Sequence, residues 1–152
     1  MISELPVIVV HTLAHSVGAL RAAMRADRRV ILASAEHAGI YAGPGWFRAL
    51  VAAAREAVPD ARCAAALLDC GDRPGAALAA IRAAVEGVIF TGHADVARRL
   101  AEIAARQGVG FVTERPATAL DLVSDFFASS NDSERRCAEF LTLPDGERGD
   151  GG

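Results

Sequence analysis

The sequence predicts one α/β domain of alternating strands and helices. Its short apolar runs are continuous rather than alternating, which is typical of strands covered on both faces of a parallel sheet. Segments with helical spacing and capping residues lie between these runs, at the spacing of repeated βα units. A chain of 152 residues is long enough for one such domain with a hydrophobic core and too short for two ordinary ones.

Five apolar runs are predicted to form a five-stranded parallel sheet, at residues 7–10, 30–33, 64–68, 88–90 and 109–112. Helices are expected at residues 16–26, from Gly45 to before Pro59, from Pro74 to before Gly87, and from Asp95 to Gly108. Thr118 and Asp121 resemble a capping box, which predicts a further helix that reaches Ser129. A last helix over residues 131–141 completes a helical C-terminus. We expect a single domain over residues 1–143 and a mobile, Gly-rich tail over residues 144–152.

Composition excludes several classes of function. The net charge of −3 and the absence of a clustered basic face argue against nucleic acid and anionic membranes as partners. All 16 basic residues are Arg, and without Lys neither Schiff-base catalysis nor the usual P-loop is available. The three cysteines form no CxxC pair, so we expect reduced thiols and a cytoplasmic location. The first residues predict neither a signal peptide nor a membrane span.

Polar residues gather just after the predicted strands, where parallel α/β sheets bind their ligands. In strand order they are His11 and His15, Glu36 and His37, Asp69 and Cys70, Thr91 and His93, and Glu114. His, Cys, Asp and Glu are the usual zinc ligands, and a carboxylate beside them can act as a general base. Asp69 is the strongest candidate, because a carboxylate at a buried strand end is costly unless it is paired or used.

Each of these residues also has a plain structural interpretation. Loops at strand ends are polar in any case, and His15 can as well face solvent on the first turn of its helix. Cys70 alone is more often a small buried apolar residue than a ligand. Glycines near the strand ends, Gly71 and Gly92 among them, fit a phosphate at a helix N-terminus but are also expected in any βα turn.

Three stretches resemble the class II, metal-dependent fructose- and tagatose-bisphosphate aldolases. They are Leu67-Leu68-Asp69-Cys70-Gly71, Ala80-Ile81, and Gly87-Val88-Ile89-Phe90-Thr91-Gly92-His93. In the family, a Leu-Asp-His-Gly strand end is followed by an Ala-Ile pair and a Val-Met-Asp-Gly-Ser strand. The run from Val30 through Glu36 to Gly43 looks like the preceding strand and loop, and residues 108–114 look like the following strand. The likeness spans residues 7–116.

The resemblance implies part of a TIM-like barrel, about its first five βα units; a doubly wound sheet remains the alternative. It also implies that Asp69 is the proton-transfer aspartate and that Glu114 matches a glutamate near the metal. The sequence departs from the family at Cys70, which replaces a zinc-ligand histidine, and at Ala35, which replaces a serine. The family's later histidine ligands and phosphate loops have no counterpart in these 152 residues.

The leading hypothesis is therefore an aldolase-like domain, without an intact aldolase centre, that binds a small phosphorylated or carbonyl compound at the strand ends. If it is an enzyme, we expect a metal-dependent lyase of the class II aldolase type. Asp69 would be the base, zinc would bind Cys70, His93 and His37, and the compound would contact Glu36, Gly71, Gly92 and Glu114. The second hypothesis is a non-catalytic barrel fragment that acts as a binding or assembly module.

A homodimer is the expected assembly. Five parallel strands cannot close a barrel, so an apolar surface must be covered by helices or by a second copy. The aromatic C-terminal segment is predicted to lie at or near the contact, with Phe126, Phe127, Phe140 and Leu141 as its large apolar residues.

Overall fold

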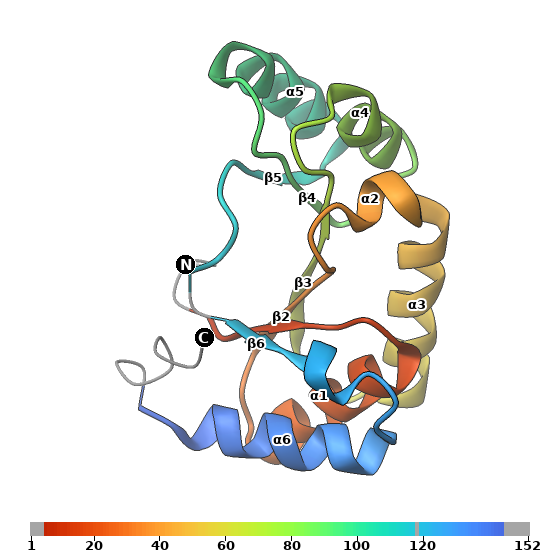
Figure 1. Cartoon of the computed structure of the whole chain (residues 1–152), viewed down its shortest axis with the longest axis vertical. Helices are drawn as coiled ribbons and strands as arrows, with labels where there is room; N and C mark the ends of the chain where they lie inside the picture. Colours follow the sequence, from red (N-terminus) through yellow and green to blue (C-terminus); the bar gives the residue numbers. More distant parts are fainter. Residues whose placement is uncertain (1–4, 118, 145–152) are drawn as a thin grey trace. The chain divides into compact units, whose positions relative to one another are not determined.

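The structure of the chain, a computed structural model, describes residues 5–117 and 119–144. It contains a six-stranded sheet with the order β5-β4-β3-β2-β1-β6 (Figure 1). The strands are β1 (Val7–Val9), β2 (Val30–Ala33), β3 (Cys63–Asp69), β4 (Gly87–Ile89), β5 (Gly110–Val112) and β6 (Ala119–Asp121). Parallel pairing joins β1 to β6, β3 to β4 and β4 to β5. The predicted α/β class is confirmed, and the five predicted strands are all present.

The helices of the described residues are α1 (Leu13–Arg25), α2 (Ala38–Tyr41), α3 (Pro44–Ala57), α4 (Pro74–Arg82), α5 (Ala94–Gln107) and α6 (Ser130–Thr142). Pro74 is the first residue of α4, as its fixed φ and missing N–H predict. Gly108 ends α5 in the left-handed conformation, at φ 70°, which also agrees with the sequence. The short helix α2 has no counterpart among the predicted elements. Among the described residues, no helix combines the length and the apolarity needed to cross a membrane.

The prediction of five strands is wrong, because a sixth strand replaces part of a predicted helix. Thr118 lies outside the described residues, and Ala119–Asp121 forms β6 instead of a first helical turn. Asp121 still caps, but it accepts the Val123 N–H at the start of a 3₁₀ turn, η2 (Leu122–Asp125). Pairing of β6 with β1 therefore outweighs the local capping signal. The expectation of a partial barrel is not confirmed by this six-stranded sheet.

The chain divides into two compact units. Unit 1 comprises Met1–Leu32, Leu50–Ala64 and Pro116–Gly152, and unit 2 comprises Ala33–Ala49 and Ala65–Arg115. The single domain over residues 1–143 stays a prediction. The mobile tail was predicted over residues 144–152, and of these only Pro144 lies within the described residues.

The core of unit 1 depends on close packing of α1 against α6. Gly18 lies at the crossing, where an added Cβ would come within 2.7 Å of Ser130 O and Glu134 N. Small buried residues on α1 flank it, namely Ala19, Ala22 and Ala23, while Phe140 and Leu141 of α6 are also buried. Because backbone approaches backbone here, the helices can pack this closely only if residue 18 has no side chain.

Unit 2 is built around β3, β4 and β5, with α4 and α5 as the connecting helices that contact each other. Parallel neighbours end at the same edge of a sheet, so the registers of β3 with β4 and of β4 with β5 align their carboxyl ends. Asp69 is paired with Ile89 in this register. The polar residues that follow the strands of unit 2 consequently share one edge.

Candidate functional site

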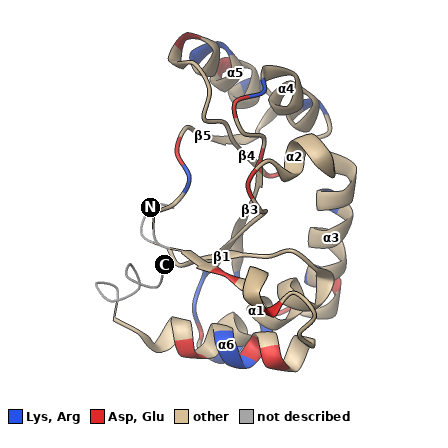
Figure 2. Cartoon of the chain, viewed as in Figure 1, with Lys and Arg blue, Asp and Glu red and all other residues tan. Residues whose placement is uncertain are grey.

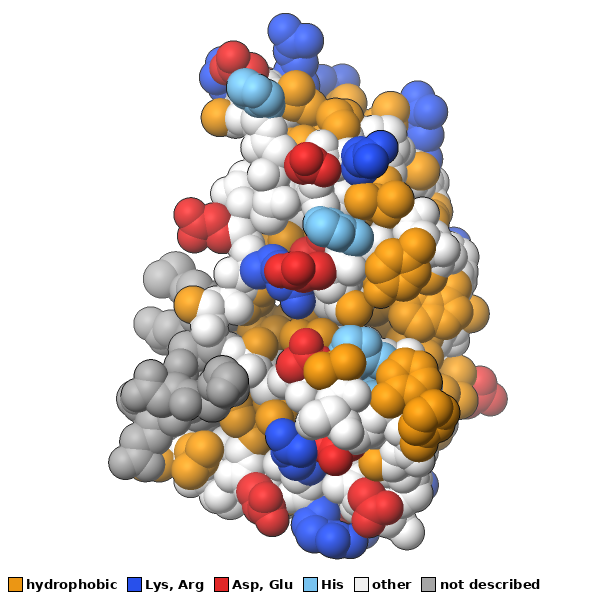
Figure 3. Space-filling view, in the orientation of Figure 1, with side chains coloured by type: hydrophobic (Ala, Val, Ile, Leu, Met, Phe, Trp, Pro, Cys, Tyr) orange, Lys and Arg blue, Asp and Glu red, His pale blue; other side chains and the backbone are white. Residues whose placement is uncertain are grey.

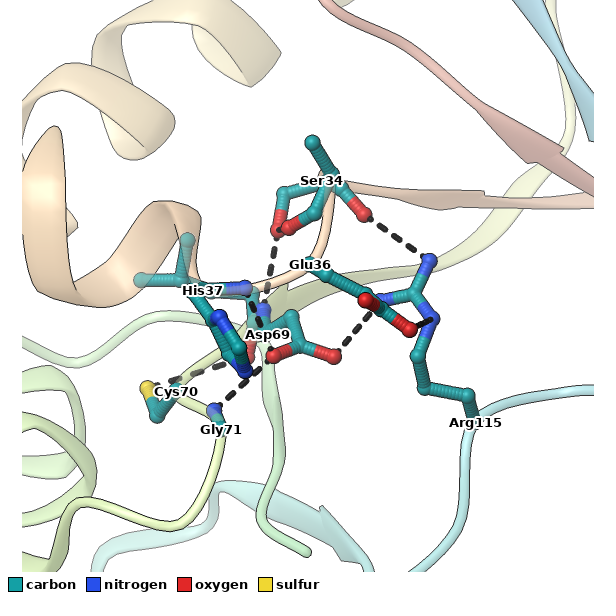
Figure 4. A network of polar contacts seen from close by, with 9 residues as sticks. Ser34, Glu36, His37, Asp69, Cys70, Gly71 and Arg115 are labelled. Atoms are coloured by element: carbon teal, nitrogen blue, oxygen red, sulfur yellow. Dashed lines mark hydrogen bonds and ion pairs between the residues drawn. The ribbon is translucent and has the colours of Figure 1, made fainter.

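A network of polar contacts in unit 2 centres on Asp69, the last residue of β3 (Figure 4). Only 1% of Asp69 is exposed. The network also contains residues that follow β2 and one that follows β5; its members, here called the Asp69 cluster, are Ser34, Glu36, His37, Asp69, Gly71 and Arg115. The Asp69 cluster therefore joins the ends of β2, β3 and β5.

The Asp69 carboxylate accepts three hydrogen bonds. Oδ1 accepts the backbone N–H groups of His37, at 3.0 Å, and Gly71, at 2.8 Å. Oδ2 accepts an N–H of the Arg115 guanidinium at 2.5 Å. A buried carboxylate is stable in its charged form only when paired and hydrogen-bonded, and here both conditions hold.

The two turns that offer these N–H groups have special backbone geometry. His37 and Gly71 both adopt the left-handed conformation, at φ 63° and 56°. A Cβ at position 71 would lie 2.4 Å from Cδ2 of the His37 ring. Glycine at position 71 is therefore required twice, by its φ and by the ring beside it.

Arg115 links Asp69 to the segment after β2. Its Nη2 donates to Ser34 O at 3.4 Å, and its Nε lies 3.7 Å from Glu36 Oε1. The Ser34 hydroxyl accepts the Asp69 N–H at 2.9 Å and donates to Ala35 O at 3.0 Å. The Arg115 guanidinium thus faces the carboxylates of Glu36 and Asp69. The formal charges of these three side chains sum to −1.

This arrangement makes Asp69 the acceptor that holds two turns and an arginine in place. A general base needs a free lone pair directed at its substrate. In the Asp69 cluster both lone pairs of Oδ1 and one of Oδ2 accept hydrogen bonds from donors of the chain itself. The predicted role of Asp69 as a base is not tested by these contacts and stays a prediction.

Cys70 follows Asp69 and is fully buried. Its thiol donates weakly to Leu68 O at 3.8 Å, and α2 packs so closely that a Cβ at Gly39 would meet the sulfur at 2.7 Å. Burial, and to a lesser degree the Asp69 carboxylate, raises the pKa of the Cys70 thiol to about 12. Because a metal binds the thiolate, zinc at Cys70 would have to displace a tightly held proton.

The raised thiol pKa predicts a loss of stability at high pH. The folded chain keeps a proton on Cys70 that the unfolded chain releases above the ordinary pKa of 9.0, so the free energy of unfolding falls between pH 9 and about 12. One such proton contributes a slope of up to about 1.4 kcal/mol per pH unit. Urea unfolding of Cys70→Ala should show a slope shallower by up to this amount between pH 9 and 10.5. Identical slopes in both proteins would contradict the assignment; the slopes at pH 6–8, where the thiol stays protonated, serve as the control.

The remaining predicted site residues divide into two groups. Glu36, His37 and Gly71 lie in the Asp69 cluster with Asp69 itself. His93, Gly92 and Glu114 take no part in its hydrogen bonds: His93 is exposed at the start of α5, Glu114 is exposed, and Gly92 packs against the Phe90 ring. Within the described residues, no three His, Cys, Asp or Glu side chains are placed to hold one metal ion. The zinc site stays a prediction.

Two members of the cluster were not predicted from the sequence. Ser34 directly follows β2, and Arg115 follows the Glu114 that was singled out. Both lie just after a strand, so the rule that site residues follow the ends of parallel strands applies to them as well. Arg115 is also the natural partner for a buried carboxylate, since Asp69 needs a positive charge.

Unit 1 holds the other two histidines, and there the solvent-facing alternative for His15 is wrong. His15 is fully buried rather than facing solvent, because Nδ1 accepts the His11 N–H and Nε2 lies 2.8 Å from Asp125 O. His11 contacts Asp121 of β6. No protein-family model matches this chain, and no curated protein matches it significantly. Function is therefore inferred from the residues and their contacts.

Proposed function

We propose that this chain is an assembly module that forms a homodimer through the surface of Val123, Phe126 and Phe127, here called the phenylalanine surface. The observation that carries this proposal is the exposure of Phe127, which reaches 96%. Val123 is 55% exposed and Phe126 45%. Large aromatic side chains contribute most of the energy of protein interfaces, and an isolated chain gains nothing from presenting one almost fully to water.

The four large apolar residues expected at the contact separate into two pairs. Phe140 and Leu141 are buried in unit 1 by the packing of α6 on α1. Phe126 and Phe127 stay outside, with their rings edge to face at 5.1 Å between centroids. Figure 3 shows large hydrophobic side chains exposed on the face that it draws. The phenylalanine surface is therefore the part of the segment that remains available for a second copy.

Charge favours a second copy as the occupant. Asp125, which precedes Phe126 in the chain, pairs with Arg136, and on α6 Asp132 pairs with Arg135 at 2.9 Å. Figure 2 shows both signs of charge along α6. A two-fold axis brings a surface onto itself, so a surface of one sign would repel its copy, whereas balanced pairs can exchange partners across the axis.

The Asp69 cluster supports an assembly role over aldolase-like catalysis. The Asp69 carboxylate already accepts three hydrogen bonds, and the adjacent Cys70 thiol holds its proton. Two carboxylates around one guanidinium also give a phosphorylated compound little electrostatic attraction. Binding of a phosphorylated or carbonyl compound at the strand ends stays a prediction.

Phe127→Ser should shift the protein from dimer to monomer. Loss of one buried phenyl ring on each side of a symmetric contact removes roughly 4 kcal/mol in total, which raises the dissociation constant by about three orders of magnitude. Sedimentation velocity at micromolar concentration measures the change. Met24→Ser, at a 40% exposed residue of α1, is the matched control and should remain dimeric. Equal sedimentation of Phe127→Ser and the unmodified chain would refute the proposed contact.

A further inference from the structure

A second polar pair lies at strand ends in unit 1. His11 follows β1 after one residue, and Asp121 is the last residue of β6, in register with Val9. Imidazole Nε2 of His11 lies 2.6 Å from Asp121 Oδ1. The two residues are 110 positions apart, so only the pairing of β6 with β1 brings them together.

The surrounding contacts fix both partners. Asp121 Oδ1 also accepts the Val123 N–H at 2.9 Å, which ties the carboxylate to η2. The backbone N–H of His11 donates to Nδ1 of the buried His15 at 3.1 Å. Because Nδ1 of His15 accepts, its proton is on Nε2, which donates to Asp125 O. The positions of the His11 backbone and of the Asp121 carboxylate are thus set by the fold rather than by solvent.

One nitrogen of the His11 ring remains open. The short contact with a carboxylate places the proton on Nε2, which leaves a lone pair on Nδ1. Within residues 5–117 and 119–144, Nδ1 of His11 has no hydrogen bond. The only buried side-chain polar atom without a partner in these residues is Ser133 Oγ, so Nδ1 of His11 is not a buried atom. Nδ1 of His11 therefore reaches solvent, in a side chain that is 12% exposed.

An aromatic ring lies beside this nitrogen base. The Phe126 ring is 6.4 Å from the His11 ring, centroid to centroid, and is 45% exposed. Phe126 also belongs to the phenylalanine surface, so its ring is an apolar wall beside the imidazole and not a platform for a ligand. Strand ends of parallel α/β sheets are where such sheets place their ligands.

We propose that His11 and Asp121 form a general-base pair that hydrolyses small esters. His11 Nδ1 takes a proton from water as the water oxygen bonds to the acyl carbon. The bond from that carbon to the leaving oxygen then breaks, the leaving oxygen keeps the electron pair, and the proton passes from Nδ1 to it or to solvent. Asp121 is the positioning residue, since it holds the Nε2–H tautomer and stabilises the imidazolium.

p-Nitrophenyl acetate is the probe for this activity, with release of p-nitrophenolate followed by absorbance. A positioned base contributes about 10² to 10⁴-fold, so the chain should exceed an equal concentration of free imidazole by at least tenfold. His11→Gln, whose amide can still donate to Asp121, should lose this excess. Asp121→Asn should reduce it at least tenfold, and Asp95→Asn, which removes an exposed ion pair with Arg98, should leave it unchanged. A rate equal to that of free imidazole, or full activity of His11→Gln, would overturn the proposal.

The tautomer of His11 gives a readout that does not depend on activity. Two-dimensional ¹H–¹⁵N spectra of the imidazoles should show the His11 proton on Nε2 at neutral pH, and Asp121→Asn should redistribute it toward Nδ1. A proton on Nδ1 in the unmodified chain would remove the base and contradict the proposal. The Phe127→Ser variant leaves His11 and Asp121 in place, so failure of the dimer and failure of this site are distinguishable.

Discussion

Asp69→Ala should lower the free energy of unfolding by about 3 kcal/mol, because it leaves the guanidinium of Arg115 and two backbone N–H groups without their acceptor. The Asp69 side chain is almost fully buried, at 2% exposure, and that of Arg115 is 23% exposed. Part of the loss is recovered when Arg115 turns to water or to Glu36. Urea denaturation at pH 7 measures the change.

Asp72→Ala is the matched control for Asp69. It removes a carboxylate three residues further along the chain, one whose side chain is 74% exposed and lies 3.9 Å from the Arg73 guanidinium. Exposed ion pairs contribute little, so this variant should stay within about 0.5 kcal/mol of the unmodified chain. Equal stability of the two variants would mean that Asp69 is not the acceptor that holds the strand ends together, and would reopen its role as a free base.

Gly18→Ala should destabilise unit 1 by about 2 kcal/mol. Alanine favours a helix over glycine by about 1 kcal/mol, but the added methyl would lie 2.7 Å from backbone atoms of α6. Backbone atoms cannot rotate away, so α6 must shift from α1 and lose part of its packing, at a cost of about 3 kcal/mol. Thermal and urea unfolding both report the net change.

Replacement of Gly75 by alanine should not lower the free energy of unfolding as it does at Gly18. Gly75 lies in the first turn of α4, and nothing within 4 Å would contact an added Cβ. Gly75→Ala should therefore be neutral or stabilising by up to about 1 kcal/mol. If Gly18→Ala behaved like Gly75→Ala, the close contact between α1 and α6 would be refuted.

Much of the fold follows from local signals in the sequence. The five apolar runs all form strands, and residues 30–33 match β2 at both ends. Pro74 and Gly108 act as the boundaries that their backbone preferences predict. The sixth strand could not be found in this way, since three residues show no period and only contact with β1, 112 positions away, makes them a strand.

The sequence predicted the site where one residue was enough for the physical argument. A carboxylate at the buried end of β3 requires a partner, and Asp69 has one in Arg115, 46 residues further along the chain. No local pattern identifies that partner. The Asp121 carboxylate was assigned to a helix cap, and its contact with His11 depends on the unpredicted strand β6. Residues joined only through tertiary pairing are the ones that sequence reasoning missed.

The mass of the unmodified protein in solution tests the proposed assembly most directly. Sedimentation equilibrium between about 1 and 100 micromolar should give twice the 15.8 kDa of one chain at the upper concentrations. A mass of 15.8 kDa over the whole range would contradict the homodimer and with it the proposed function of the phenylalanine surface.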